Sequence, residues 1–451
     1  MTLPRILHRT LARLGCAAAG VALFGGALWR AVKNAEFRST MSERLGGGEW
    51  PKFLTTLRDD IPVVWIHAAS LGELQGVVPI MRSLSARYPN ARFLLTTTSF
   101  AGRAAARSMF PTVTCLFLPL DVPFVASRIA RAVNPAVFLN FETEMWPNLL
   151  FALQSLRTKV FFVNGRISDF SFQQYKTFRA LFGEALRGVQ TFFVQTDLDR
   201  ERFVALNVQR GRIQVCGSTK YDQGEDVVAA EDRVVSRREF RVPPGSVCLV
   251  AGSVRPGEDA LVIAAFIEAR RKVANLSLII APRHADRFSA VGGLLHDNGL
   301  EYLQRSSIGH GDDLPVLLLD TLGELKRAYG AGDLAFVGGT LVDIGGHNPF
   351  EPAMFGIPVI VGPSVKNVRD AVSELKRSGG LFQVEDGLQL AAVIERLARD
   401  ESLRRASGES ARRTWVKNLG ATRHVISEID DVLVARIAHD QPQSPRAVGE
   451  R

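Results

Sequence analysis

Short apolar runs that alternate with stretches of helical period constrain the fold of this chain most strongly. The alternation begins near Ile61 and starts again near Val247. Continuous apolar strands joined by helices predict parallel sheets that are covered on both faces. The predicted strands are 63–67, 93–97, 113–118, 136–140, 160–163 and 192–195, then 247–251, 276–281, 316–319, 334–337, 358–361 and 381–384.

The repeated pattern predicts two domains, which 451 residues are sufficient to build. We place the boundary in the polar stretch 217–244, which gives an acceptor-binding domain at 36–222 and a nucleotide-binding domain at 223–438. Residues 1–35 are predicted to be a membrane anchor, and 439–451 a disordered tail. Doubly wound sheets bind ligands beyond the carboxyl ends of their strands, so we expect the chemistry in those loops, in a cleft between the domains.

One apolar run near the N-terminus, LGCAAAGVALFGGALW at 14–29, lies between Arg13 and Arg30. As a helix it spans roughly 24 Å, slightly less than a bilayer core. A cleaved signal, a buried core helix and a membrane anchor are the alternatives. The terminal Trp29 disfavours cleavage, and the flanking arginines favour an anchor that either spans the membrane or lies in it.

The first 40 residues hold a surplus of five of the chain's nine net positive charges, which favours an anionic membrane over nucleic acid.

The first polar loop, HAASLGELQG at 67–76, directly follows a predicted strand. Glu73 opens the next helix, where it either takes a proton from an attacking hydroxyl or complements the helix dipole. His67 is either a ligand-binding residue or a hydrogen-bonded core histidine.

Two further loops of the first domain carry charge. NFETEMWPN at 140–148 presents Glu142 and Glu144 after a strand, where carboxylates suit sugar hydroxyls. No third ligand lies near them, so no metal site is predicted. NGRIS at 164–168 carries Arg166, which either meets an anion or forms a surface ion pair.

The strongest signal lies at 336–363, FVGGTLVDIGGHNPFEPAMFGIPVIVGP. Two glycine pairs precede an expected helix, whose N-terminus would suit a phosphate, and Glu351 in its first turn would accept hydrogen bonds from a ribose. The loop 252–258 and Arg283 are further anion-site candidates.

Together, HAASLGE, ETEMWPN, NGRIS, PRH and GELKRAYGAGDLAFVGGTLVDIGGHNPFEPA resemble, in order and spacing, the 3-deoxy-D-manno-octulosonic acid (Kdo) transferases of lipopolysaccharide synthesis. The resemblance runs from about Glu43 to Asp370. It implies a GT-B fold with two Rossmann-like domains and an inverting transfer of Kdo from CMP-Kdo to a lipid A precursor, lipid IVA. It also implies no metal or cofactor, and a place at the cytoplasmic face of the bacterial inner membrane.

The resemblance assigns roles to particular residues. Glu73 falls on the family's catalytic base, Arg283 would stabilise the leaving phosphate and Glu351 would hold the ribose. The predicted donor-site residues are Gly252, Ser253, Arg283, His284, Gly345, Gly346, Asn348, Glu351 and Asn367. The predicted acceptor or sugar-binding residues are His67, Ser70, Gly72, Glu142, Glu144, Arg166 and Lys220.

Two segments depart from the family pattern. The family's GSTHEGEE reads GSVRPGED here, from Gly252, and its GNLKFD reads GSTKYD, from Gly217. The alternatives to a Kdo transferase are another GT-B transferase or sugar-nucleotide epimerase with a UDP or GDP donor, a non-catalytic membrane scaffold and a nucleic-acid binder. Preference for UDP over CMP would favour the first of these.

Overall fold

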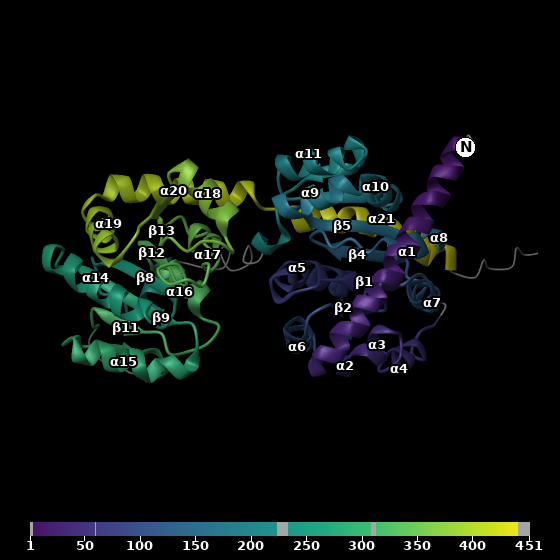
Figure 1. Ribbon diagram of the computed structural model, residues 1–451. Helices are drawn as coiled ribbons and strands as arrows, with labels where there is room; N and C mark the ends of the chain where they lie inside the picture. Colours follow the sequence, from purple (N-terminus) through teal and green to yellow (C-terminus); the bar gives the residue numbers. More distant parts are fainter. Residues whose placement is uncertain (1–2, 59, 223–232, 308–312, 441–451) are drawn as a thin grey trace, which may run out of the picture. The chain divides into compact units, whose positions relative to one another are not determined.

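The computed structural model describes residues 3–58, 60–222, 233–307 and 313–440. The chain divides into two compact units (Figure 1). The first comprises Met1–Gln223 together with Leu419–Arg451, and the second comprises Gly224–Asn418.

The first unit is built on a seven-stranded parallel sheet with the strand order β3-β2-β1-β4-β5-β6-β7. Its central strands are buried along their whole length, because helices cover both faces, as the continuous apolar runs predict. The strands are β1 (Val63–His67), β2 (Arg92–Thr97), β3 (Thr114–Phe117), β4 (Val137–Phe141), β5 (Lys159–Gly165), β6 (Thr191–Val194) and β7 (Ile213–Val215).

Helices precede, connect and flank these strands. They are α1 (Leu3–Lys33), α2 (Ala35–Ser39), α3 (Met41–Arg44), α4 (Trp50–Leu54), α5 (Leu71–Arg87), α6 (Phe100–Met109), α7 (Pro123–Val133), α8 (Pro147–Ser155), α9 (Asp169–Thr177), α10 (Arg179–Leu186), α11 (Asp197–Ala205) and α21 (Ala421–Asp440), with 3-10 turns η1 (Arg210–Arg212) and η2 (Thr219–Tyr221).

The second unit holds another seven-stranded parallel sheet, ordered β10-β11-β9-β8-β12-β13-β14. Without the short edge strands β7 and β10, the two sheets share one strand order, which is the order of doubly wound nucleotide-binding folds. The strands are β8 (Val247–Val254), β9 (Leu276–Pro282), β10 (Leu303–Gln304), β11 (Val316–Leu318), β12 (Leu334–Val337), β13 (Val359–Val361) and β14 (Leu381–Gln383).

Its helices are α13 (Arg233–Glu239), α14 (Glu258–Lys272), α15 (Phe288–Asp297), α16 (Leu325–Ala331), α17 (Phe350–Ala353), α18 (Arg369–Ser378), α19 (Gly387–Arg399) and α20 (Glu401–Lys417), with 3-10 turns η3 (Ala285–Arg287) and η4 (Arg305–Ser307).

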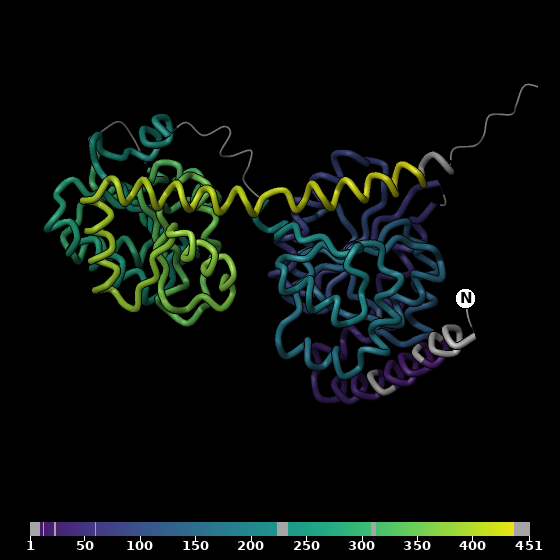
Figure 2. The backbone as a smooth tube through the Cα atoms, turned by 90° about the horizontal axis from the view of Figure 1, so that it is seen from above, coloured from purple at the N-terminus to yellow at the C-terminus, as the bar shows by residue number. Residues whose placement is uncertain are grey.

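The C-terminal helix α21 corrects the predicted domain boundary. The second domain was expected to run to residue 438, but the chain returns to the first unit at Leu419. Val425, Ile426 and Ile429 are buried in the apolar layer beside the first sheet. Figure 2 shows α21, in yellow, lying along that unit. Of the predicted disordered tail 439–451, residues 439 and 440 instead end α21, and residues 441–451 lie outside the described residues.

The N-terminal helix α1 packs one side against α7, α8 and α10. A Cβ on Gly20 would lie 2.6 Å from the Asp121 backbone oxygen, so glycine permits the close approach. Asn148 Nδ2 donates to the Cys16 carbonyl at 3.1 Å. The opposite side is exposed, with Trp29 64% accessible. Residues 13–33 are long and apolar enough to cross a membrane by length and composition.

Candidate functional site

In each unit, unusual side chains gather where the two central strands end. β1 and β4 are neighbours in the first sheet, as β8 and β12 are in the second. These neighbours are the points at which the strand order reverses, and doubly wound folds bind their ligands at such points.

Glu73, in the first turn of α5, is a buried carboxyl with few hydrogen bonds. The Ala69 N–H donates to Oε2 at 2.7 Å, and the Ser70 hydroxyl donates to Oε1 at 2.9 Å. Burial, followed by the charge of Glu142, raises the pKa of Glu73 to about 7 against the effect of these two bonds. At neutral pH the group therefore both gains and loses a proton readily, as a general base requires.

Glu142 follows β4 in a left-handed backbone conformation, with φ 54°. This region is uncommon for residues other than glycine, and functional sites are enriched in such strain. The Glu142 N–H donates to the Val163 carbonyl at 2.8 Å, and Lys220 Nζ donates to Glu142 Oε1 at 2.8 Å. The structure therefore brings together Glu73, Glu142 and Lys220 from three different segments.

His67, predicted as a sugar ligand, is fully buried and positions another residue. Its Nε2 lies 3.0 Å from Glu144 Oε2, and its Nδ1 lies 3.1 Å from the Thr96 hydroxyl. Nδ1 also lies 3.0 Å from the Thr96 carbonyl oxygen, so the ring is held by Thr96 on one side and by Glu144 on the other. The core-histidine interpretation therefore describes His67 better, although the ring orients Glu144.

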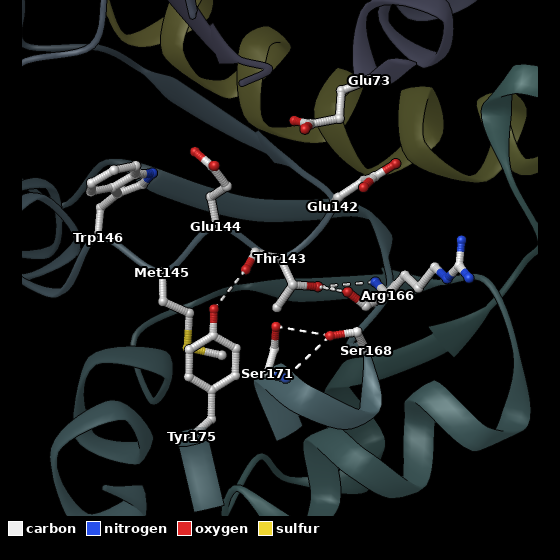
Figure 3. Close-up of a pocket in the computed structure, with 10 residues that line it drawn as sticks. All are labelled: Glu73, Glu142, Thr143, Glu144, Met145, Trp146, Arg166, Ser168, Ser171 and Tyr175. Atoms are coloured by element: carbon white, nitrogen blue, oxygen red, sulfur yellow. Dashed lines mark hydrogen bonds between the residues drawn. The ribbon is translucent and has the colours of Figure 1, made fainter. Parts of the chain in front are cut away.

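A pocket of about 540 Å³ lies beside these acids. Figure 3 shows the three carboxylates on one side of it and Ser171 and Tyr175 on the other. The pocket is lined by Glu73, Glu142, Thr143, Glu144, Met145, Trp146, Arg166, Ser168, Ser171 and Tyr175.

Two buried polar atoms close to this pocket have no hydrogen-bond partner among the described residues: Trp146 Nε1 and Asn140 Oδ1. Unpaired buried polar atoms are costly, so these two are strained features of the segment that follows β4. Arg166 reaches the rim, where its N–H donates to the Thr143 hydroxyl at 3.0 Å. Of the other predicted residues, Ser70 donates a hydrogen bond to Glu73. Gly72, between these two residues in the sequence, is exposed.

In the second unit, glycines let the loops after β8 and β12 approach each other closely. A Cβ on Gly252 would lie 2.0 Å from the Tyr329 hydroxyl, and one on Gly338 would lie 2.3 Å from the Ser253 carbonyl oxygen. Ser253 itself is left-handed, with φ 57°. The predicted donor residues Gly252 and Ser253 therefore shape the backbone of the site.

Glu258, the first residue of α14, is fully buried and accepts four backbone N–H groups. They come from Gly339 at 2.6 Å, Leu341 at 2.7 Å, Thr340 at 2.8 Å and Arg255 at 3.0 Å. This carboxylate ties the loop after β12 to the loop after β8.

The N-terminal amides of α14 do not provide the anion site suggested for residues 252–258. Asp259 accepts the N–H groups of Gly257 and Ala260 at 3.1 and 3.0 Å, and Glu258 accepts the Arg255 N–H, so these donors are already satisfied.

The helix expected after the second glycine pair is too short to bind a phosphate through its dipole. α17 has four residues, and a single turn has little dipole. Asn348 Oδ1 accepts the Phe350 N–H at 3.1 Å, and Asn367 Nδ2 donates to the Ile344 carbonyl at 3.0 Å. Both asparagines therefore hold the loop that contains Gly345 and Gly346.

Glu351, in α17, has a carboxyl group whose pKa is raised. Burial raises its pKa, and the charges of Lys326 and Arg283 oppose the rise. Its charge therefore interacts with that of Arg283.

A group of cations and imidazoles lies at the ends of β8, β9 and β12. Arg255 Nη1 lies 2.6 Å from His284 Nε2, and Arg255 Nε lies 3.4 Å from His347 Nε2. Burial, with the charges of Arg283 and Arg255, lowers the pKa of His347 to about 4. The sequence indicated the loop 252–258 as an anion-site candidate, but no separate role was predicted for Arg255 or Glu258, and none for His347. The signal for Arg255 was its departure from the family pattern.

Known proteins share similarity with this chain over the segments that carry these loops. Residues 39–223 match the family model of 3-deoxy-D-manno-octulosonic-acid transferase (kdotransferase). The chain is 32% identical over 411 residues to a 3-deoxy-D-manno-octulosonic acid transferase of Bordetella pertussis, covering 86% of this chain and 94% of that protein. A bifunctional glycosyltransferase/methyltransferase of Fusobacterium nucleatum is 29% identical over 83% of this chain, which spans 58% of that protein's length.

The solved structure of MurG from Acinetobacter baumannii is similar with a TM-score of 0.54 at 13% identity, covering 82% of this chain and 99% of that one. This likeness bears on the fold alone, and it confirms the expected GT-B fold with two parallel-sheet domains.

Proposed function

This chain belongs to the 3-deoxy-D-manno-octulosonic acid transferase family, and from that premise we propose that it transfers Kdo from CMP-Kdo to a lipid A precursor. The observation that carries the proposal is Glu73, a buried carboxyl with a pKa of about 7 that lines a polar pocket within the matched segment. A carboxyl of this pKa is suited to activate a sugar hydroxyl at neutral pH.

The pocket of the first unit would hold the acceptor sugar. Glu142 and Glu144 offer carboxylate oxygens to hydroxyl groups. A pocket of about 540 Å³ has room for a sugar ring with polar groups around it. The acyl chains of the precursor would extend beyond it.

In the reaction, Glu73 takes the proton of the acceptor hydroxyl as its oxygen forms a bond to the anomeric carbon of Kdo. The bond from that carbon to the phosphate oxygen breaks, and its electron pair leaves with CMP. Attack from the face opposite the leaving group inverts the anomeric centre. Arg283 would stabilise the charge that develops on the phosphate, and Glu351 would accept hydrogen bonds from the ribose.

We further propose that α1 attaches the protein to the cytoplasmic face of the inner membrane, where the lipid acceptor resides. Its exposed side carries Leu14, Val21, Leu28 and Trp29, with Arg30 and Lys33 in its last turn. Arginine and lysine side chains would reach the head groups while the apolar side enters the lipid. Deletion of residues 1–33 should release the protein from membranes, whereas persistent binding would contradict this role.

The decisive experiment measures transfer of labelled Kdo from CMP-Kdo, generated in place, to a tetra-acylated lipid A precursor, with the product weighed by mass spectrometry. We expect product, and its added mass gives the number of sugars. Turnover should survive chelation, because the proposed chemistry needs no metal. Absence of product, or preferential binding of UDP over CMP, would overturn the proposal and favour a different sugar-nucleotide enzyme.

A further inference from the structure

The group formed by Arg255, Arg283, His284 and His347 holds more positive charge than the described protein around it neutralises. Neither arginine forms an ion pair with a carboxylate among the described residues. The guanidinium of Arg255 contacts two imidazole nitrogens, and its Nη2 has no hydrogen-bond partner in the described part of the chain. Buried or crowded cations are costly unless they are paired, so the arrangement favours anionic ligands.

The two arginines occupy different positions relative to the proposed nucleotide site. Arg283 interacts electrostatically with both Glu351 and His347. Arg255 contacts His347 and His284, and no interaction joins it to Glu351. Arg255 is therefore fixed against the two imidazoles, and Arg283 is the arginine whose charge acts on Glu351.

Arg255 is held in place from its backbone. Its N–H donates to Glu258, and it precedes the left-handed Gly257 at the start of α14. The side chain is only partly buried. The two imidazoles hold the guanidinium through Nε and Nη1 and leave Nη2 available, an arrangement suited to ligand recognition because little rotational freedom remains to be lost on binding.

The proposed donor has two anionic groups. Its phosphate is a diester with one negative charge, and its sugar is an acid whose carboxylate carries another. A guanidinium binds a carboxylate through two parallel hydrogen bonds, so a second arginine in the same group of side chains matches the second anion.

We propose that Arg255 binds the carboxylate of the donor sugar, while Arg283 binds the phosphate. This assignment rests on the proposed function and extends it to the choice of sugar. It makes the second unit selective for nucleotide-linked acidic sugars over neutral ones.

The test compares Arg255→Gln with the matched control Arg283→Gln. Each variant is assayed for its KM for CMP-Kdo and for the inhibition constant of CMP, which has the phosphate but no carboxylate. Arg255→Gln should raise the KM about tenfold or more and change CMP inhibition less than about twofold, whereas Arg283→Gln should weaken both. Arg255→Lys, which keeps the charge, should fall between wild type and Arg255→Gln.

An unchanged KM in Arg255→Gln, or an equal loss of CMP-Kdo and CMP binding, would overturn the assignment. Thermal melting of each variant separates a binding defect from a folding defect. If wild type neither binds CMP nor transfers Kdo, the proposed function itself fails. If wild type is active and Arg255→Gln has the same KM, only the assignment of Arg255 fails.

Discussion

Each unit places one buried glutamate at the start of the helix that follows the first strand of its sheet, and the two differ in their hydrogen bonds. Glu258 accepts four backbone N–H groups. Glu73 accepts one backbone N–H and one hydroxyl, and its pKa rises to about 7. The number of donors around a buried carboxylate therefore separates a structural acid from a reactive one.

The same contrast extends to the surrounding charge. The neighbours of Glu73 are two more acids, Glu142 and Glu144, whereas the loops around Glu258 carry Arg255 and Arg283. Two sheets with the same core strand order thus carry different side chains at equivalent edges, because the loops and not the strands determine the chemistry.

The comparison predicts its largest effect for Glu73→Gln. Removing the base should lower kcat by about a hundredfold to ten-thousandfold, since general-base catalysis contributes this much. Folding should be retained, because glutamine keeps the size and an acceptor for the Ala69 N–H. Kdo transfer rates beside circular dichroism melting measure this, and near-normal turnover would show that another group is the base.

Glu258→Gln should do the reverse and weaken the fold. An amide presents N–H groups toward a cluster of backbone donors, so we expect a loss of about 2–4 kcal/mol in the unfolding free energy of the second unit. Urea unfolding measures it, with Glu268→Gln on the exposed side of α14 as the control, expected within about 0.5 kcal/mol of wild type. Equal stability of both variants would mean that the four hydrogen bonds contribute little.

A pH series sharpens the contrast further. The folded pKa of Glu73 is raised from 4.5 to about 7, so the folded state holds its proton more tightly than the unfolded chain. Its contribution to stability is greatest below pH 4.5 and is lost as the pH rises through about 7, by up to about 3 kcal/mol. The unfolding free energy of Glu73→Gln minus that of wild type should therefore grow between pH 5 and pH 8. A constant difference would contradict the raised pKa.

The smallest effect concerns the nucleotide. Glu351→Ala should weaken CMP binding about tenfold through the loss of ribose hydrogen bonds, without unfolding the protein. Calorimetry with CMP measures the change, and Glu73→Gln, in the other unit, serves as the control that should bind CMP normally. Unchanged affinity would remove Glu351 from the donor site.

The sequence predicted the central strands to within a few residues, because buried parallel strands are continuous apolar runs. It missed β7 and β10, which are three and two residues long and only partly buried. The destination of α21 could not be predicted either. An apolar helix face such as that of Val425 and Ile429 indicates burial, but it does not identify the sheet that buries it.

The site was predicted less completely than the fold. Glu73, Glu142 and Glu144 were found because loop residues after strands were examined as a class. The role of Glu258 depends on N–H groups some 80 residues later in the chain, which no local pattern reveals. Glycine, proline and an acidic residue correctly predicted where α17 begins, but they did not predict that this helix has only four residues.

The return of α21 to the first unit has a consequence for synthesis of the protein on the ribosome. When the first 223 residues have emerged, the apolar layer beside β1 and β4 still lacks Val425, Ile426, Ile429 and Leu433. The nascent first unit must wait, with that surface uncovered, until the second unit has been translated. A premature stop before codon 421 would therefore damage the half of the protein that was made first.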